Sequence, residues 1–191
     1  MISFIEFEIA VRGLLRLARF DAGFAGFFDL SQDGARRSFR LALPLLPLYL
    51  AMLHINTTWP ADADLARVVF AETIGYVVMW AAFPLLLIGV GRVIDRTPKV
   101  WGAIAVYNWL SVLSMALQLP IVLAIYSGLS GDLGLMLGLL ALGFVIACEY
   151  FAFRRLLDIG IEMTIALVLV DFILGQAIIA VRDLVAQGPL F

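Results

Sequence analysis

The chain has 191 residues, of which 63% are hydrophobic, 13 are Lys or Arg and 15 are Asp or Glu. An ordinary soluble domain has about 45–50% apolar residues, so this composition argues against a soluble domain and indicates a membrane protein. The single cysteine excludes a disulfide framework and a cysteine-based zinc site. The net charge of -2 gives no reason to expect nucleic acid as a partner, and we expect neither a cofactor nor a bound metal.

Residues 1–37 precede the first long apolar stretch and are predicted to form a cytoplasmic arm. Basic side chains recur at helical spacing, at Arg12, Arg16 and Arg19, while apolar residues occupy another face. This pattern is typical of an amphipathic helix in the membrane interface, with its cations at the lipid headgroups. It fits equally well a helix packed on the cytoplasmic ends of the spans or on a partner protein.

Five apolar stretches follow, each as long as the roughly 20 residues that a helix needs to cross a bilayer. The connectors between them are short, so little of the chain is left for a folded domain outside the membrane. We therefore predict an all-α fold: a polytopic transmembrane bundle of five helices over residues 38–185 and a periplasmic tail over 186–191. The stretches cover residues 38–57, 68–90, 101–126, 133–153 and 161–181.

Proline interrupts three of the five stretches. Pro44 and Pro47 lie in the first, Pro84 in the second and Pro120 in the third. Each proline removes a backbone hydrogen bond and predicts a kink. The alternative is a hinge or an unwound binding site of the kind found in transporters.

The fourth stretch carries two kinds of candidate contact. Gly134 and Gly138 form a Gly-x-x-x-Gly pair, which lets two helices approach closely. We expect it to pack within the bundle, and a homodimer seam is the alternative. Glu149 lies one turn from Arg154 and Arg155 near the inner end of the stretch, where one of these cations could pair with it.

Glu72 and Asp171 lie inside the second and fifth stretches, where an ionisable group is costly and suggests a function. No Lys or Arg lies deep inside any of the five stretches, so Asp171 has no cation at its depth. Its expected companions are Asn108, Gln118 or Gln176. Burial favours a neutral, protonated carboxyl, which would then hold helices together, and a proton or cation relay is the alternative.

No phosphate-binding loop, Ser-His-Asp set or carboxylate pair with room for water stands out, so we predict no enzymatic activity. The leading hypothesis is a scaffold or accessory subunit that binds the lipid bilayer and a protein partner, or forms a homo-oligomer. The rival hypothesis is a small transporter or channel that uses the proline-containing helices and the buried polar groups. A continuous polar cavity would favour the rival, whereas polar groups that satisfy one another would favour the scaffold.

Residues 91–93, Gly-Arg-Val, form a short basic turn after the second stretch, and residues 106–110, Val-Tyr-Asn-Trp-Leu, lead to Leu119-Pro120 in the third. With the arm and five spans, these segments resemble the Yip1-like family of five-span membrane proteins over about residues 38–185. The arm motif of the family's eukaryotic members is missing here, so their binding of small GTPases is not implied. The chain is also similar to small inner-membrane proteins of alphaproteobacteria. The resemblance implies a topology and no reaction.

The basic residues predict the orientation, because they are retained preferentially on the cytoplasmic side. Eleven of the 13 flank the ends that would face the cytoplasm, and only Arg67 and Arg182 flank the others. Arginine outnumbers lysine twelve to one, which suggests a high-GC bacterium and its inner membrane. The eleven cations are Arg12, Arg16, Arg19, Arg36, Arg37, Arg40, Arg92, Arg96, Lys99, Arg154 and Arg155.

This topology predicts the behaviour of reporters fused to the two ends of the chain. A reporter before Met1 should stay cytoplasmic, and one after Phe191 should behave as periplasmic, because five spans place the termini on opposite sides. Alkaline phosphatase and green fluorescent protein fusions measure this directly. Two termini on the same side would contradict the count of five.

Overall fold

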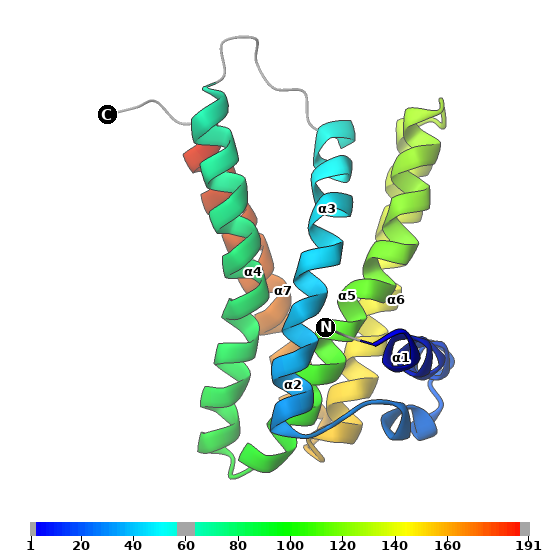
Figure 1. The fold of residues 1–191 in the computed structure, drawn as a ribbon, viewed down its shortest axis with the longest axis vertical. Helices are drawn as coiled ribbons and strands as arrows, with labels where there is room; N and C mark the ends of the chain where they lie inside the picture. Colours follow the sequence, from blue (N-terminus) through cyan, green and yellow to red (C-terminus); the bar gives the residue numbers. More distant parts are fainter. Residues whose placement is uncertain (1–2, 57–63, 188–191) are drawn as a thin grey trace.

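A computed structural model describes residues 3–56 and 64–187. Every element in these ranges is a helix, which confirms the all-α prediction. Four helices are long and apolar enough to cross a membrane, and they run side by side along the long axis of the molecule (Figure 1). The chain thus fits a multi-pass membrane protein. The four are α4 (Leu65–Val93), α5 (Thr97–Tyr126), α6 (Gly131–Leu156) and α7 (Ile161–Gln187).

The first predicted span has a different construction. α2 (Gln32–Ser38), the 3-10 turn η2 (Phe39–Leu41) and α3 (Ala42–Asn56) follow one another along a single line (Figure 1). α3 alone has 15 residues, fewer than the roughly 20 that span a bilayer. Four helices of spanning length are therefore present in the described ranges, where the sequence predicts five. The predicted last residue of the first span, Thr57, lies outside these ranges.

The long helices extend beyond the predicted apolar stretches because polar residues cap them. The Asp64 side chain accepts hydrogen bonds from the backbone of Ala66 and Arg67 at the start of α4, and Ser130 caps α6 in the same way. α7 continues through the predicted boundary of the tail at residue 186. This extension matters because it places Arg182 within the helix.

The prolines do not break the helices. α3, α4 and α5 continue through Pro47, Pro84 and Pro120 respectively. A helix in a membrane bundle tolerates a missing backbone hydrogen bond because neighbouring helices can offer the freed carbonyl another partner. The predicted alternative of an unwound binding site at these positions is therefore wrong.

The predicted arm divides in two, because its last residues belong to α2, in line with α3. Its first part, which keeps the name arm below, consists of α1 (Phe4–Leu17) and the 3-10 helix η1 (Ala22–Phe27), which lie beside the bundle near the end where α2 begins (Figure 1). α1 buries Ala10, Leu14 and Leu17 in a core shared with Trp109 of α5 and Cys148 of α6. The apolar face expected from the sequence is thus only partly buried. Phe4 is 81% exposed, and Ile5, Ile9 and Leu15 also point away from the protein.

Close packing of the arm depends on Gly13. A Cβ atom there would lie 2.7 Å from both Phe27 Cβ and Phe28 Cε2, which is closer than real Cβ contacts allow. Phe28 in turn contacts the Trp109 ring, with the ring centroids 6.4 Å apart. The arm is thus attached to the bundle by apolar packing.

The charged side chains of the arm are paired mainly with acids nearby in the sequence. Arg12 lies 2.7 Å from Glu8, and Arg16 lies 3.3 Å from Asp21. Exposed pairs of this kind contribute about 0–1 kcal/mol each, so they add little to the attachment. Arg19 is exposed at the end of α1.

Arg37 links the arm to α2. Its guanidinium forms ion pairs with Glu6 of α1 and with Asp29, which precedes α2. Hydrogen bonds from the Ser31 side chain and backbone, together with Arg37, hold the pKa of Asp29 below its ordinary value. This carboxylate therefore stays ionised and keeps its position at the start of α2.

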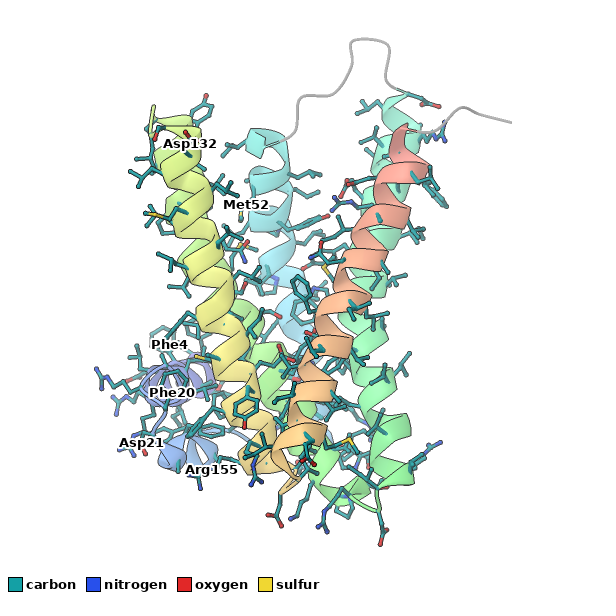
Figure 2. All side chains as sticks on the ribbon, turned by 180° about the vertical axis from the view of Figure 1, so that it is seen from behind. Phe4, Phe20, Asp21, Met52, Asp132 and Arg155 are labelled. Carbon is teal, nitrogen blue, oxygen red and sulfur yellow. The ribbon has the colours of Figure 1, made fainter. Side chains whose placement is uncertain are left out.

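Charges are distributed unequally between the two ends of the bundle. Arg155 lies at one end of α6 and Asp132 at the other (Figure 2). The α4–α5 turn, with Arg92 and Arg96, lies at the same end as Arg155 and the start of α2 (Figure 1). The structure thus gathers basic residues at one end, as expected from alternating helix directions.

Candidate functional site

A first buried polar cluster, the outer cluster, consists of Tyr49 of α3, Glu72 of α4 and Arg182 of α7. Arg182 Nε lies 3.3 Å from Glu72 Oε1. The Tyr49 hydroxyl donates to Glu72 Oε2 over 2.6 Å and accepts from Arg182 Nη1 over 3.0 Å. Glu72 is only 3% exposed, so a carboxylate inside the bundle is neutralised by a cation and ties α4 to two other helices, α3 and α7.

The fit of Arg182 requires a small residue opposite it. A Cβ atom on Gly75 of α4 would lie 3.0 Å from Arg182 Cγ. The guanidinium also donates to the Asp183 side chain through Nε and Nη2, so Nε is directed at Asp183 and the contact with Glu72 Oε1 is mainly Coulombic. The sequence places Arg182 just beyond the fifth apolar stretch, and the structure extends α7 through it to Gln187, so the guanidinium reaches Glu72 from the outer end of the helix.

A second cluster, the inner cluster, consists of Tyr107 of α5, Glu149 of α6 and Asp171 of α7. The Tyr107 hydroxyl donates to Asp171 Oδ1 over 2.9 Å. The Glu149 side chain lies within hydrogen-bonding reach of the Asp171 carboxyl. Glu149 is 5% exposed, and its Oε1 atom has no hydrogen-bond partner among the described residues. Two acids therefore meet where the sequence predicts one.

The position of Tyr107 is fixed by aromatic packing. Its ring lies 4.9 Å from that of Phe83 in α4 and 6.2 Å from that of Phe153 in α6, measured between centroids. Phe83 and Phe153 are each 1% exposed or less. Because three helices hold the ring, its hydroxyl is directed at Asp171 without a flexible side chain.

The expected partners of the two inner acids are wrong. Neither nearby arginine pairs with Glu149, because Arg154 donates to the backbone carbonyl of Ile159 and Arg155 lies over the Phe151 ring, 5.5 Å from its centroid. The amide side chains expected beside Asp171 also do not pair with it. The sequence shows that these residues are buried in a bundle, but not which helix faces they share.

Each of the three amide side chains has a different environment. Asn108 donates to Ser38 Oγ over 2.9 Å, which links α5 to α2. Gln118 donates to Ser114 Oγ one turn earlier in α5, over 2.7 Å. Gln176 is exposed, and no hydrogen bond of its side chain is found among the described residues. It is five residues from Asp171, and this spacing places the two on different faces of α7.

A cavity of about 210 Å³ lies where α3, α4 and α5 meet. Tyr49 of the outer cluster and Tyr107 of the inner cluster both line it, so it lies between the two. Asn108 contributes a buried Oδ1 atom that has no hydrogen-bond partner within residues 3–56 and 64–187. The other lining residues are Leu45, Tyr76, Met79, Trp80, Ser111, Ser114, Met115 and Gln118.

The two glycines of the Gly-x-x-x-Gly pair differ in their surroundings. A Cβ atom on Gly134 would lie 2.5 Å from Ile125 Cδ1, whereas one on Gly138 would meet nothing within 4 Å. Gly134 therefore permits close packing of α6 on α5 inside the bundle, and Gly138 is free of such a constraint.

Comparison of the chain with models of protein families, with characterised proteins and with solved structures finds no match. The resemblance to the Yip1-like family therefore depends on the sequence segments described above. Within the described ranges, no group of three or more His, Cys, Asp or Glu side chains comes together that could hold a metal ion.

The outer cluster predicts a strong stability effect. Arg182→Gln should lower the free energy of unfolding by on the order of 3–5 kcal/mol, because removing one partner leaves the buried Glu72 carboxylate uncompensated. The double variant Glu72→Gln/Arg182→Gln should recover much of this loss. Thermal or steric-trapping unfolding in lipid bicelles measures both.

Asp183→Asn is the matched control. Its carboxylate also contacts Arg182 but is 44% exposed, so this change should cost no more than about 1 kcal/mol. Additive effects of the Glu72 and Arg182 substitutions would show that the two residues do not interact.

Proposed function

We propose that the chain is a non-enzymatic inner-membrane protein with five spans, which acts as a scaffold or accessory subunit of a membrane complex. The continuous line of α2, η2 and α3 beside the four long helices supports a fifth span (Figure 1). The gathering of Arg92, Arg96 and Arg155 at one end supports an N-terminus in the cytoplasm. The likeness to the Yip1-like family belongs to this proposal.

The observation that carries the scaffold function is the pairing of polar groups within the bundle. Glu72 is neutralised by Arg182, and Asp171 contacts Tyr107 and Glu149. These ionisable residues thus contact one another across helices. A transport path needs polar groups that remain free to bind and release an ion.

One polar group inside the membrane is directed outward. Gln176 lies on an exposed stripe of α7 near the middle of the helix, where lipid offers its amide no hydrogen bond. In membrane bundles, glutamine commonly forms hydrogen bonds with another helix. The stripe, which we call the α7 outer face, consists of Ile165, Leu169, Phe172, Ile173, Gln176 and Ala180.

A second copy of this chain is the occupant that fits the α7 outer face. A glutamine amide both donates and accepts hydrogen bonds, so two Gln176 side chains related by a two-fold axis can pair reciprocally. Ala180, one turn further along, is small enough for a close approach of the two helices. Assembly through α7 would bring two arms to the same side of the membrane.

The arm completes the proposed scaffold at the cytoplasmic surface. Its exposed cations Arg12, Arg16 and Arg19 accompany the exposed apolar side chains Phe4 and Ile5. Cations at the headgroups and apolar groups below them are typical of an interfacial helix. The arm would thus contact both the bundle and the lipid surface.

The cavity favours a second candidate function, a small transporter or channel. It is lined by polar side chains from α5, and the Asn108 Oδ1 atom has no hydrogen-bond partner in the part of the chain that the structure describes. This function requires ion or solute flux in proteoliposomes, and Asp171→Asn should abolish a proton-coupled flux without unfolding the chain. The scaffold function predicts no flux from the wild-type chain.

The scaffold function predicts that Gln176→Leu weakens self-association. An interhelical hydrogen bond in a membrane contributes about 0.6 kcal/mol and up to about 2 kcal/mol. The association constant of the dimer should therefore fall by about 3- to 30-fold per bond. Resonance energy transfer between labelled chains in liposomes, over a range of lipid ratios, measures the constant.

Leu140→Ala is the control, because it changes an exposed α6 side chain without removing an amide, and it should leave the constant unchanged. A wild-type chain that stays monomeric at every lipid ratio would contradict self-association. Stoichiometric copurification of a different protein that is lost in Gln176→Leu would assign the α7 outer face to that partner instead.

A further inference from the structure

The two buried clusters contain carboxyl groups in opposite electrostatic surroundings. Glu72 faces the guanidinium of Arg182 at 3.3 Å. Glu149 and Asp171 face each other, and the third member of their cluster is the neutral hydroxyl of Tyr107. A cation therefore neutralises the outer carboxylate, and the inner pair needs another source of neutrality.

Two ionised carboxylates cannot share such a site. Like charges side by side in a poorly polarisable medium repel strongly, and one of the two carboxyl groups then retains its proton. The two acids, Glu149 of α6 and Asp171 of α7, face each other. Tyr107 of α5 faces them through its hydroxyl, and the Phe83 ring of α4 packs against Tyr107. None of these is a cation.

A further observation points to a ligand between the two acids. Glu149 is 5% exposed, and its Oε1 atom has no hydrogen-bond partner in the described part of the chain. A buried acceptor without a donor is rare in folded proteins. A proton on either carboxyl would supply the missing donor.

We propose that Glu149 and Asp171 together bind one proton, which is shared between their carboxyl groups and fastens α6 to α7. The Tyr107 hydroxyl donates to Asp171 Oδ1, which leaves the remaining Asp171 lone pairs for the shared hydrogen bond. The Glu149 and Asp171 carboxyls thus carry one negative charge in total instead of two.

A proton fits the pair better than a metal ion does. Ca²⁺ and Mg²⁺ in proteins have six or more oxygen ligands, whereas the described surroundings offer two carboxyl groups and one hydroxyl. The described residues form no group of three acidic, histidine or cysteine side chains around the pair.

The shared proton makes the stability of the bundle depend on pH. The folded chain holds this proton at neutral pH, whereas solvated carboxyl groups release theirs near pH 4. Since the folded state binds more protons than the unfolded state, the stability falls as the pH rises. At alkaline pH the pair loses its proton, and the two carboxylates repel α6 from α7.

Infrared spectroscopy of the full chain in proteoliposomes tests the proposal. The wild type should show the C=O stretching band of a protonated carboxyl at neutral pH, and the band should shrink as the pH rises. The band should disappear in Glu149→Gln/Asp171→Asn, whose amides supply N–H donors in nearly the same shape. Glu162→Gln, which changes an exposed acid of α7, should retain it.

Thermal unfolding from neutral to alkaline pH is the second measurement, and it uses the wild type and the single variants Glu149→Gln and Asp171→Asn. The melting temperature of the wild type should fall with rising pH, and that of each variant should fall less. A folded wild type without the band at neutral pH would overturn the proposal. So would a band that persists in the double variant, or one that is lost on adding sodium or calcium at constant pH, which would indicate a cation site.

Discussion

Hydrocarbon does not solvate charge, and this constraint governs the interior of the bundle. Each ionisable group on a face buried between helices must be neutralised by another part of the same chain or by a proton. The outer cluster meets the constraint with a cation, since Arg182 crosses to Glu72. The inner cluster has no cation, and we infer that Glu149 and Asp171 meet the same constraint with a shared proton. Both arrangements connect helices that are distant in the sequence.

The function that we propose depends on a polar group that has no such partner among the described residues. The described ionisable residues of the core have partners inside the chain, whereas Gln176 faces outward from the middle of α7. An amide in that position is better satisfied by another helix than by lipid. The cavity between α3, α4 and α5 favours transport instead, because Asn108 presents an oxygen without a hydrogen-bond partner among the described lining residues. The contrast between a paired interior and an unpaired outer face favours assembly over transport.

The sequence predicts the helices well because long apolar stretches are a strong signal. It also identifies the residues that matter in the interior, Glu72 and Asp171. It does not predict their partners, because partnership depends on which faces of different helices meet. Arg182 is placed outside the fifth span because polar residues extend α7 beyond its most apolar stretch. Glu149 is given the wrong partner because its nearest cations in sequence, Arg154 and Arg155, contact a backbone carbonyl and an aromatic ring.

The ionisable side chains inside the bundle are neutralised by other protein groups and by protons, and water does not enter to solvate them. Thiol accessibility tests it most directly, with Ser114→Cys placed in the cavity wall of a Cys148→Ala chain and Ser127→Cys in the exposed turn after α5 as the control. A membrane-impermeant maleimide should modify residue 127 from the outer side and should not modify residue 114 from either side. Rapid modification of residue 114 from either side would show a water-filled path and would contradict the account.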